Sequence, residues 1–326
     1  NRLRYHSQLQ ALRQQPPSDR QSLLFLGTGG GVGTAARQNT SILWRLTNNY
    51  GILLDCGCNV LRRLDQLFGS QQRDEILRRL LAIVVTHPHF DHYSYLLSLL
   101  CHYRTHPRSF PLLVILPQPL VEYVQTILGM QTASWGIVVV PIGENMVNTT
   151  IPLNALCVSN GSSEEQRVGD QLKAAIGIRL LRTQHTQHSY AIAFHTVSTG
   201  ENILTFSGDT LPLTRLMDGA SILIHECTFD HEDRNVEAKR HTTLKGFAEC
   251  WNRCYRKPLF TFLTHLSGRR RLNKETGEKT VETDECLAQR IINDYPELAS
   301  EVSIAFDNML VDFDGLFPSL ATEYEM

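Results

Sequence analysis

The sequence lacks three features that would each assign it to a broad class of proteins. No apolar run approaches the roughly 20 residues that a membrane-spanning helix needs, which excludes such a helix from this stretch of chain. The eight cysteines form no paired CxxC spacing, which argues against a zinc ribbon and is typical of free thiols in a reducing compartment. The net charge of −2 produces no field that would attract nucleic acid to the whole molecule, so RNA binding would need a local basic patch.

The most informative segment present is THPHFDH, residues 86–92. It follows the apolar run LAIVV, residues 81–85, which has the length and composition of a buried strand. Imidazoles and carboxylates are the donors that zinc takes in hydrolytic sites, so we expect the first two histidines to bind one ion and the other two ligands to reach a second. A histidine cluster that binds nothing is the alternative. The four potential ligands are His87, His89, Asp91 and His92.

Strand-like and helix-like patterns alternate along the rest of the chain without a short internal repeat, which predicts two sheets sandwiched between helices. The polar stretches 159–170 and 267–284 are predicted to be surface loops. Predicted helices cover residues 60–68, 93–103 and 285–295. Predicted strands cover residues 22–26, 40–46, 51–54, 81–85, 112–116, 136–140, 178–182, 190–196, 203–207, 221–224, 259–263 and 302–305.

A glycine-rich loop, GTGGGVG at residues 27–33, follows the first predicted strand. A nucleotide-binding loop is one interpretation, but no GxGxxG register fits and no GK[ST] follows. The other interpretation is a tight turn that lets the backbone approach a metal site.

A two-metal site needs further ligands and a bridging carboxylate, and three candidates lie at the ends of later predicted strands. His188 precedes the strand 190–196, Asp209 follows the strand 203–207, and His265 follows the strand 259–263. A single histidine at such a position is more often a hydrogen-bonded filler, but three strand-end positions together favour a metal centre.

These motifs together resemble the metallo-β-lactamase-fold hydrolases and, within them, tRNase Z, the endonuclease family that removes 3′ trailers from precursor tRNA. The histidine motif marks only the superfamily, whereas the SGDT, HExT and HxT elements are much more specific to tRNase Z. The resemblance implies an αββα sandwich over residues 21–326, preceded by an N-terminal extension or linker over residues 1–20. The matching segments are 25–29, 54–57, 86–92, 188–190, 207–210, 224–228, 241–243, 264–267 and 305–307.

The resemblance also implies two zinc ions, with Mn²⁺ or Mg²⁺ as alternatives. One ion would be held by His87, His89 and His188, the other by Asp91, His92 and His265, and Asp209 would bridge the two.

Catalytic roles follow from the same resemblance. Asp91 would be the general base toward the water that the two cations activate. Glu226 would orient His241 as the proton donor to the leaving oxygen, although a buried structural carboxylate is the alternative for Glu226. Asp55 would anchor a ligand histidine from behind.

The departures from the family concern RNA recognition. The family's Pro-x-Lys-x-Arg-Asn stretch is GTAARQN here, residues 33–39, and its DCGEG is DCGCN, residues 55–59. The short family form carries a basic arm, for which residues 188–209 leave no room. The chain therefore resembles the catalytic C-terminal half of a long form, in which an N-terminal half or a partner protein supplies the grip on RNA. Candidate RNA contacts are Arg37, Arg269, Arg270 and Arg271.

Three functional classes stay open. The first is a zinc-dependent endoribonuclease acting on precursor tRNA or another structured RNA. The second is a small-molecule phosphodiesterase of the same fold, which would explain the missing lysine. The third is a catalytically weak or inactive structural factor in an RNA–protein assembly, such as one in ribosome biogenesis. The start of the chain is rich in arginine, which favours a mitochondrial location over the nucleus or cytoplasm, and no membrane partner is expected.

Overall fold

The structure is a computed structural model. Residues 1–20 lie outside its described part, so their interpretation as an extension or linker stays a prediction. The described residues are 21–31, 34, 37–106, 108, 110–156, 163–229, 239–266, 270–272, 279–281 and 283–313.

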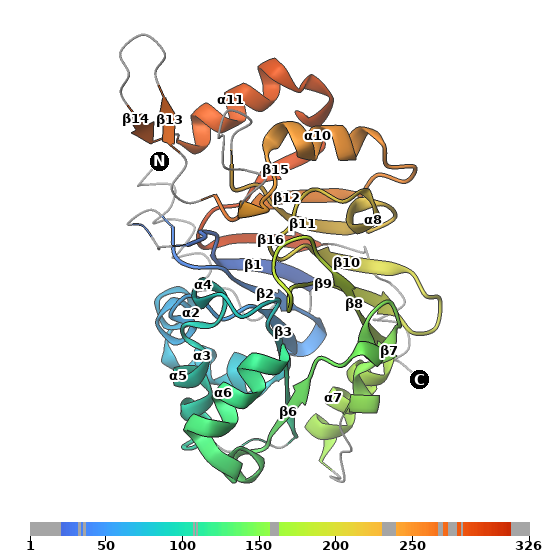
Figure 1. Cartoon of the computed structure of the whole chain (residues 1–326). Coiled ribbons are helices and arrows are strands. Elements are labelled where there is room, and N and C mark those ends of the chain that lie inside the picture. Colours follow the sequence, from blue (N-terminus) through green and yellow to red (C-terminus); the bar gives the residue numbers. More distant parts are fainter. Residues whose placement is uncertain are drawn as a thin grey trace.

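Two seven-stranded sheets form the centre of the molecule (Figure 1). The first sheet has the order β16-β1-β2-β3-β4-β5-β6, with β16 Met309–Phe313, β1 Gln21–Gly27, β2 Ser41–Arg45, β3 Gly51–Leu54, β4 Leu80–Val84, β5 Leu112–Leu116 and β6 Ile137–Pro141. The second has the order β15-β12-β11-β10-β9-β8-β7, with β15 Val302–Ile304, β12 Phe260–Thr264, β11 Ile222–Glu226, β10 Asn202–Phe206, β9 Tyr190–Thr196, β8 Ile176–Arg182 and β7 Ile151–Pro152.

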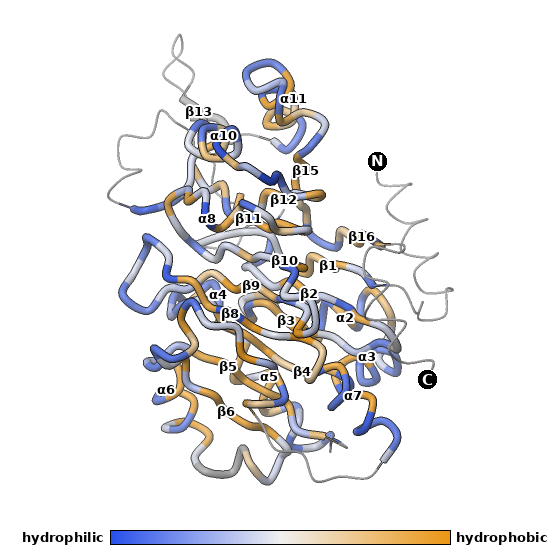
Figure 2. Tube along the Cα trace, turned by 90° about the vertical axis from the view of Figure 1, so that its right-hand side faces the viewer, coloured by the Kyte–Doolittle hydropathy of each residue, from blue (hydrophilic) through white to orange (hydrophobic). Residues whose placement is uncertain are grey.

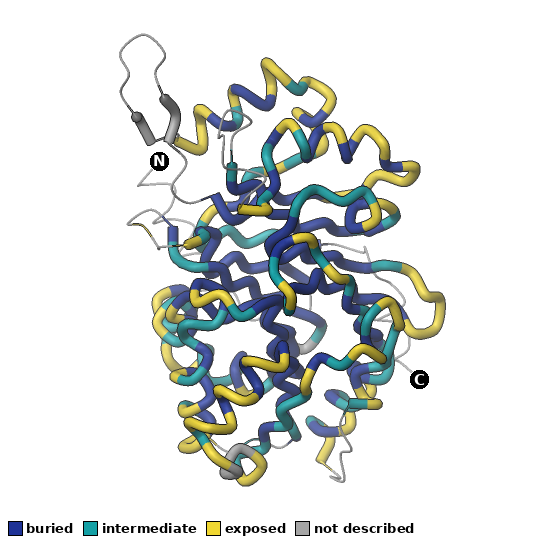
Figure 3. The backbone as a smooth tube through the Cα atoms, viewed as in Figure 1, coloured by how far each residue is buried: buried dark blue, intermediate teal, exposed yellow. Residues whose placement is uncertain are grey.

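Helices cover the outer faces of both sheets, while the inner faces pack against each other. The largest core cluster joins the two sheets, and Trp44 of β2 meets Phe194 of β9 with ring centroids 5.2 Å apart. In Figures 2 and 3 the strands are mostly hydrophobic and buried, whereas the helices expose their outer sides. The first sheet packs against α2 Val60–Phe68, α3 Ser70–Arg78, α5 Leu96–His102 and α6 Gln118–Leu128; the second packs against α8 Thr214–Met217, α10 Leu244–Asn252 and α11 Asp284–Asp294.

The direction of the central strands determines where a site can form. Strands β3 to β6 run parallel in the first sheet, and β10, β11, β12 and β15 run parallel in the second. Each sheet therefore gathers the carboxyl ends of its parallel strands at one edge, where ligands bind in open α/β sheets. The carboxyl ends of β4, β10, β11 and β12, with the segments that follow them, carry the histidine motif, SGDT, HExT and His265.

The predicted strands are confirmed within a residue or two of their ends, and the predicted helix 60–68 is α2. The predicted helix 93–103 is instead two pieces, α4 Phe90–Tyr93 and α5, separated by a short turn. The predicted loop 159–170 is wrong beyond residue 163, because α7 Glu164–Ala175 begins there. Ser163 caps this helix by accepting a hydrogen bond from the Gln166 N–H, and two acidic residues in its first turn suit the helix dipole.

The remaining elements are short. No helix among the described residues is both long enough and apolar enough to cross a membrane. A two-stranded hairpin, β13 Arg270–Leu272 and β14 Lys279–Val281, occupies part of the predicted loop 267–284. Within the described ranges, five 3₁₀ turns connect the larger elements: Thr47–Asn49, Gly129–Trp135, Glu144–Met146, Leu153–Leu156 and Pro296–Leu298.

Candidate metal centre

The loop after β4 is fixed by a buried carboxylate on the neighbouring strand end. Asp55, directly after β3, accepts hydrogen bonds from the Thr86 N–H at 2.8 Å and from the Thr86 hydroxyl at 3.1 Å. Asp55 adopts a left-handed backbone conformation (φ 56°), a strained state that persists where the surroundings demand it. The strand end thus presents the histidine motif in one geometry.

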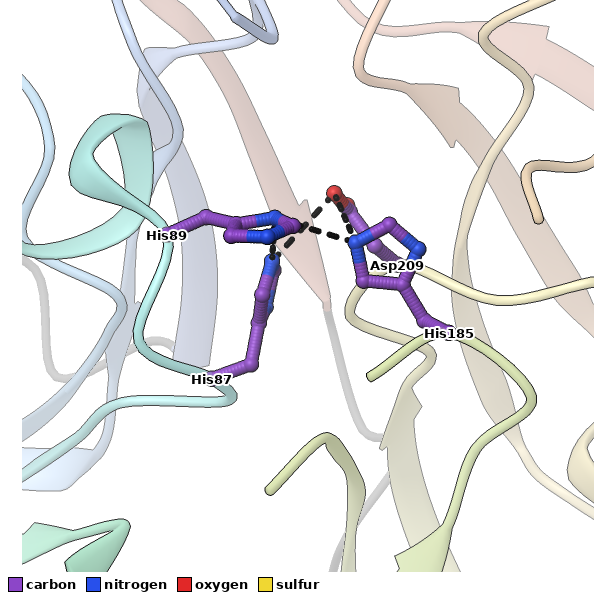
Figure 4. A group of neighbouring side chains, drawn as sticks. All are labelled: His87, His89, His185 and Asp209. Carbon is purple, nitrogen blue, oxygen red and sulfur yellow. Dashed lines mark hydrogen bonds and ion pairs between the residues drawn. The ribbon is translucent and has the colours of Figure 1, made fainter. Parts of the chain in front are cut away.

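A first group of ligand atoms comes from His87, His89, His185 and Asp209, which all lie within 4.8 Å of one another (Figure 4). The His89 Nδ1 atom lies 3.1 Å from His87 Nε2 and 3.0 Å from His185 Nε2. Burial and the neighbouring His92 lower the pKa of His87 to about 3, so its imidazole is neutral at pH 7. Neutral imidazole is the form that binds a metal ion.

A second group contains Asp91, His92 and His265, all buried. The Nε2 atoms of His92 and His265 lie 3.3 Å apart, and His265 Nε2 lies 3.3 Å from Asp91 Oδ2. Burial alone would raise the pKa of Asp91, but the hydrogen bond from His265 and the nearby His92 outweigh it and hold that pKa below its usual value. Asp91 is therefore an ionised carboxylate at neutral pH.

Asp209 lies between the two groups. Its Oδ2 atom is 3.4 Å from His87 Nε2, while its Oδ1 atom is 3.4 Å from His92 Nε2 and 3.3 Å from His265 Nε2. The two oxygens of one carboxylate thus face different ligand groups, which is the arrangement of a bridging ligand.

The residues fit a pair of divalent cations. Asp209 Oδ1 is buried and makes no hydrogen bond, although imidazole nitrogens surround it. Burial lowers the pKa values of His87, His89 and His185, and these rings turn nitrogens toward each other at 3.0–3.1 Å, which needs a shared proton or a cation between them. Buried polar groups in this state are costly unless a partner satisfies them, and nitrogen and carboxylate donors are the set that zinc prefers.

The third histidine of the first group is His185, whereas the sequence analysis assigned His188. His188 is half-buried and belongs to none of the ligand groups found among the described residues. The loop before β9 is closed by a hydrogen bond from the Thr183 N–H to the Ser189 carbonyl, and His185 Nδ1 lies 3.1 Å from the Arg240 carbonyl oxygen. The candidate ligand therefore lies five residues before Tyr190, on a folded loop and not at the start of the strand. The only sequence signal for it was a second histidine three positions earlier.

The glycine-rich loop passes directly against the second ligand group. A Cβ at Gly30 would lie 2.0 Å from a ring atom of His265, and the Gly31 N–H donates to Asp91 Oδ2 at 2.5 Å. Thr28 and Asp307 anchor the loop, since the Thr28 N–H and hydroxyl both donate to Asp307 Oδ1. The loop thus has the geometry of a tight turn whose backbone approaches the candidate metal centre.

Three side chains hold the ring orientation of ligand histidines from behind, and sequence reasoning named one of them. Asp55 Oδ2 lies 2.6 Å from His92 Nδ1, at the position that the sequence analysis gave it. The hydroxyl of Thr86 lies 3.0 Å from His87 Nδ1. The hydroxyl of Thr228 lies 2.7 Å from His265 Nδ1. Occupying Nδ1 leaves Nε2 free to face the metal centre.

Glu226 and His241 form a pair beside the metal centre. Glu226 ends β11, is completely buried, and its Oε1 atom lies 2.9 Å from His241 Nδ1. Burial would lower the pKa of His241, but the Glu226 carboxylate outweighs it and raises that pKa above its usual value. His241 Nδ1 lies 3.9 Å from Asp209 Oδ2, so its imidazole stands at the edge of the first ligand group.

The four arginines predicted to contact RNA are either buried or lack a described side chain. Arg37 is buried, where it pairs with Asp284 at 2.5 Å and donates to the Ala305 carbonyl at 2.7 Å. Its prediction as an RNA contact is wrong, because a guanidinium in these bonds is occupied by the fold. Arg270 and Arg271 begin β13, but their side chains are outside the described part of the structure, as is all of Arg269.

Comparison with known proteins places the chain in a family. The family model described as "Anti-Pycsar protein Apyc1" matches residues 21–257. The chain belongs to this family. Among curated relatives, "Ribonuclease Z, mitochondrial" of Drosophila melanogaster is 29% identical over 323 residues, covering 93% of this chain and 37% of that protein. "Zinc phosphodiesterase ELAC protein 2" of Mus musculus is 29% identical over 316 residues, covering 91% of this chain and 34% of that protein.

Solved structures show the same fold. A long-form RNase Z from yeast superimposes with a TM-score of 0.68 at 21% identity, covering 94% of this chain and 44% of that one. The metallo-β-lactamase-fold protein YhfI from Bacillus subtilis superimposes with a TM-score of 0.62 at 16% identity, covering 90% of this chain and 100% of that one. The predicted metallo-β-lactamase fold and the resemblance to tRNase Z are confirmed. The chain spans little more than a third of the length of the curated relatives it matches.

Proposed function

We propose that this chain is a zinc-dependent phosphodiesterase of the tRNase Z class, which hydrolyses precursor tRNA at its 3′ end and releases the 3′ trailer. The single observation that carries the proposal is the Asp209 carboxylate, which divides its two oxygens between two groups of ligand histidines beside the Glu226–His241 pair. The names of the relatives, ribonuclease Z and zinc phosphodiesterase, agree with it.

The proposed ligand set is His87, His89 and His185 for one ion, Asp91, His92 and His265 for the other, and Asp209 for both. Bound divalent cations would supply a water of lowered pKa and would neutralise charge on the phosphoryl group. Zinc fits the donors, and Mn²⁺ or Mg²⁺ are the alternatives.

The side chains of this protein then provide the proton transfers. Asp91 is ionised and lies in the site, so it accepts the proton of the attacking water, while the Gly31 N–H holds its Oδ2 atom in place. On the other side, His241 donates a proton to the leaving oxygen. Glu226 favours the protonated form of that imidazole by raising its pKa, and the hydrogen bond between them fixes its orientation.

An exposed aromatic ring at the rim suits a substrate with unpaired bases. Phe90 lies between the ligands His89 and Asp91, and 68% of its surface is exposed. The Phe90 ring makes an edge-to-face contact with Tyr93, with ring centroids 5.9 Å apart, and Tyr93 makes the same kind of contact with Tyr123 at 5.8 Å. We propose that a base next to the scissile phosphate stacks on Phe90, since such stacking contributes about 1–3 kcal/mol per base.

A small phosphodiester is the second candidate substrate. The observation that favours it is Arg37, the one basic residue kept from the family's recognition stretch, which is buried against Asp284 and so does not reach out to RNA. Under the first proposal, an N-terminal half or a partner protein supplies the grip on tRNA. A mitochondrial location is proposed with it, because the name of the Drosophila melanogaster relative gives that location for that protein.

One experiment separates the classes. The zinc-loaded protein and an Asp209→Asn variant are assayed on precursor tRNA and on bis(4-nitrophenyl) phosphate. The proposal expects both substrates to be cleaved and both activities to be lost in the variant. Cleavage of the small diester alone would select the second candidate, and binding of metal without either activity would select a structural role in an RNA–protein assembly.

A further inference from the structure

A second cluster of potential ligands lies outside the metal centre, in a pocket between α3 and the end of α5. The pocket has a volume of about 380 Å³ and contains Asp74, His102 and His106. One ligand atom from each of these three residues lies within 4.8 Å of the other two. None of the three belongs to the ligand groups described above, and the proposed reaction uses none of them.

The two histidines are already arranged side by side. Their rings stack with centroids 3.8 Å apart and planes 16° apart. His106 Nδ1 lies 3.0 Å from the His102 carbonyl oxygen, so its N–H donates there and Nε2 carries the free lone pair. The hydrogen bond fixes the tautomer of His106 in the same way that backbone carbonyls orient ligand histidines in zinc sites.

His102 offers a nitrogen that the fold leaves unsatisfied. Its side chain is only 11% exposed, and its Nε2 atom is buried without a hydrogen bond while lying 3.6 Å from Asp74 Oδ1. Burial and the neighbouring His106 lower the pKa of His102, so the ring is neutral and able to bind a cation at pH 7. A nearly buried nitrogen facing a carboxylate oxygen needs a proton or a cation between them.

Asp74 completes the donor set, although it has a competitor. Arg73 Nε donates to Asp74 Oδ1 at 2.8 Å, and this bond lowers the pKa of the carboxyl group. A carboxylate offers two oxygens and about four lone-pair directions, so one hydrogen bond leaves room for a metal ion. The positive charge of Arg73 weakens the binding of a cation and keeps the site weaker than the main centre.

We propose that Asp74, His102 and His106 form a second, separate zinc-type site that ties the end of α5 to α3. Two imidazoles and one carboxylate leave the fourth position of a tetrahedral ion to water. Donors around zinc lie about 3.3 Å from one another, so the three side chains need to close by an ångström or so, which the exposed His106 allows. Metal binding at this second site does not depend on hydrolysis at the main centre.

Zinc stoichiometry tests the proposal. The full chain is dialysed against a series of buffered zinc concentrations, and zinc per chain is measured by elemental analysis. The comparison uses wild type, His106→Ala and Asp74→Asn, with Gln71→Ala as the matched control, because Gln71 lines the same pocket without an imidazole or a carboxylate. Hydrolysis of a model diester monitors the main centre in every variant.

We expect His106→Ala and Asp74→Asn each to bind one zinc fewer than wild type and Gln71→Ala, with unchanged hydrolysis. Equal zinc in all four proteins would overturn the proposal. So would an additional zinc that fills at the same concentration in His106→Ala as in wild type, because that ion would lie elsewhere. Circular dichroism of each variant confirms that a lost equivalent does not come from unfolding.

Discussion

Asp209 is the residue on which both ligand groups depend. Its two oxygens lie 3.3–3.4 Å from histidines that approach from different strand ends, and its carboxylate is buried. His185 and His241 lie near Asp209 on loops outside the helices and strands. Replacing either side chain is therefore expected to change metal binding or catalysis and to leave the fold intact. The predictions at this scale therefore concern single substitutions.

His185→Ala removes a ligand of the first group, and we expect zinc binding and phosphodiester hydrolysis to fall by more than about 100-fold. Loss of a residue that only orients a ligand already costs about 10–100-fold. His188→Ala, three positions along the same loop, is the matched control and retains both. Metal content and kcat/KM are the measurements. Equal losses in the two variants would contradict the assignment of His185.

His241→Ala removes the proposed proton donor, and we expect kcat on RNA to fall about 10²–10⁴-fold, the usual contribution of general acid catalysis. A 4-nitrophenyl diester has a leaving group that needs no proton, so its hydrolysis falls much less. Glu226→Gln follows the same pattern because Glu226 raises the pKa of His241. A loss that does not depend on the leaving group would assign the pair a structural role.

Phe90→Ala removes the exposed ring at the rim, and we expect KM for RNA to rise by roughly 5- to 150-fold, which corresponds to about 1–3 kcal/mol. Phe90→Trp preserves a stacking face and is the matched control. Hydrolysis of a small diester without bases stays constant in both. Unchanged KM in Phe90→Ala would show that no base stacks there.

At the scale of elements, the glycine-rich loop after β1 closes over the second ligand group. We expect Gly30→Ala to lower zinc affinity, because its Cβ would lie 2.0–2.4 Å from three His265 ring atoms. Gly31→Ala is the control for backbone strain, since Gly31 has a φ of +66° but open space around its Cβ position. Equilibrium dialysis gives the affinities and urea unfolding the stabilities. A larger loss of affinity in Gly31→Ala would contradict the steric account.

The sequence predicted the strands of this fold more fully than its site. Apolar runs such as 112–116 fill one strand each, so their bounds follow directly from composition. It missed α7 because the first half of that helix is polar, and a capping serine with two glutamates resembles a loop. His185 and the buried Arg37 could not be predicted, because both depend on contacts with Arg240 and Asp284 that are distant in the chain.

At the scale of the whole molecule, the metal centre joins loops from both sheets. The ligands after β4 belong to the first sheet, while Asp209 and His265 follow strands of the second. Cations held there would therefore link the two halves of the sandwich, in addition to the apolar core between them. Metal binding should accordingly contribute to global stability.

Removal of metal by a chelator is expected to lower the free energy of unfolding. A ligand that binds only the native state stabilises it by about 4 kcal/mol at 1,000 times its Kd. Thermal unfolding with and without zinc measures the shift, and Asp209→Asn should reduce it strongly. An equal zinc-induced shift in that variant would show that the stabilising ions bind elsewhere.

The most direct test of the central proposal is the cleavage position in a 3′-labelled precursor tRNA incubated with the zinc-loaded protein, beside an Asp91→Ala control. We predict cleavage just after the discriminator base by the wild-type chain and none by the variant. Cleavage at scattered positions, or cleavage that survives in Asp91→Ala, would contradict the account.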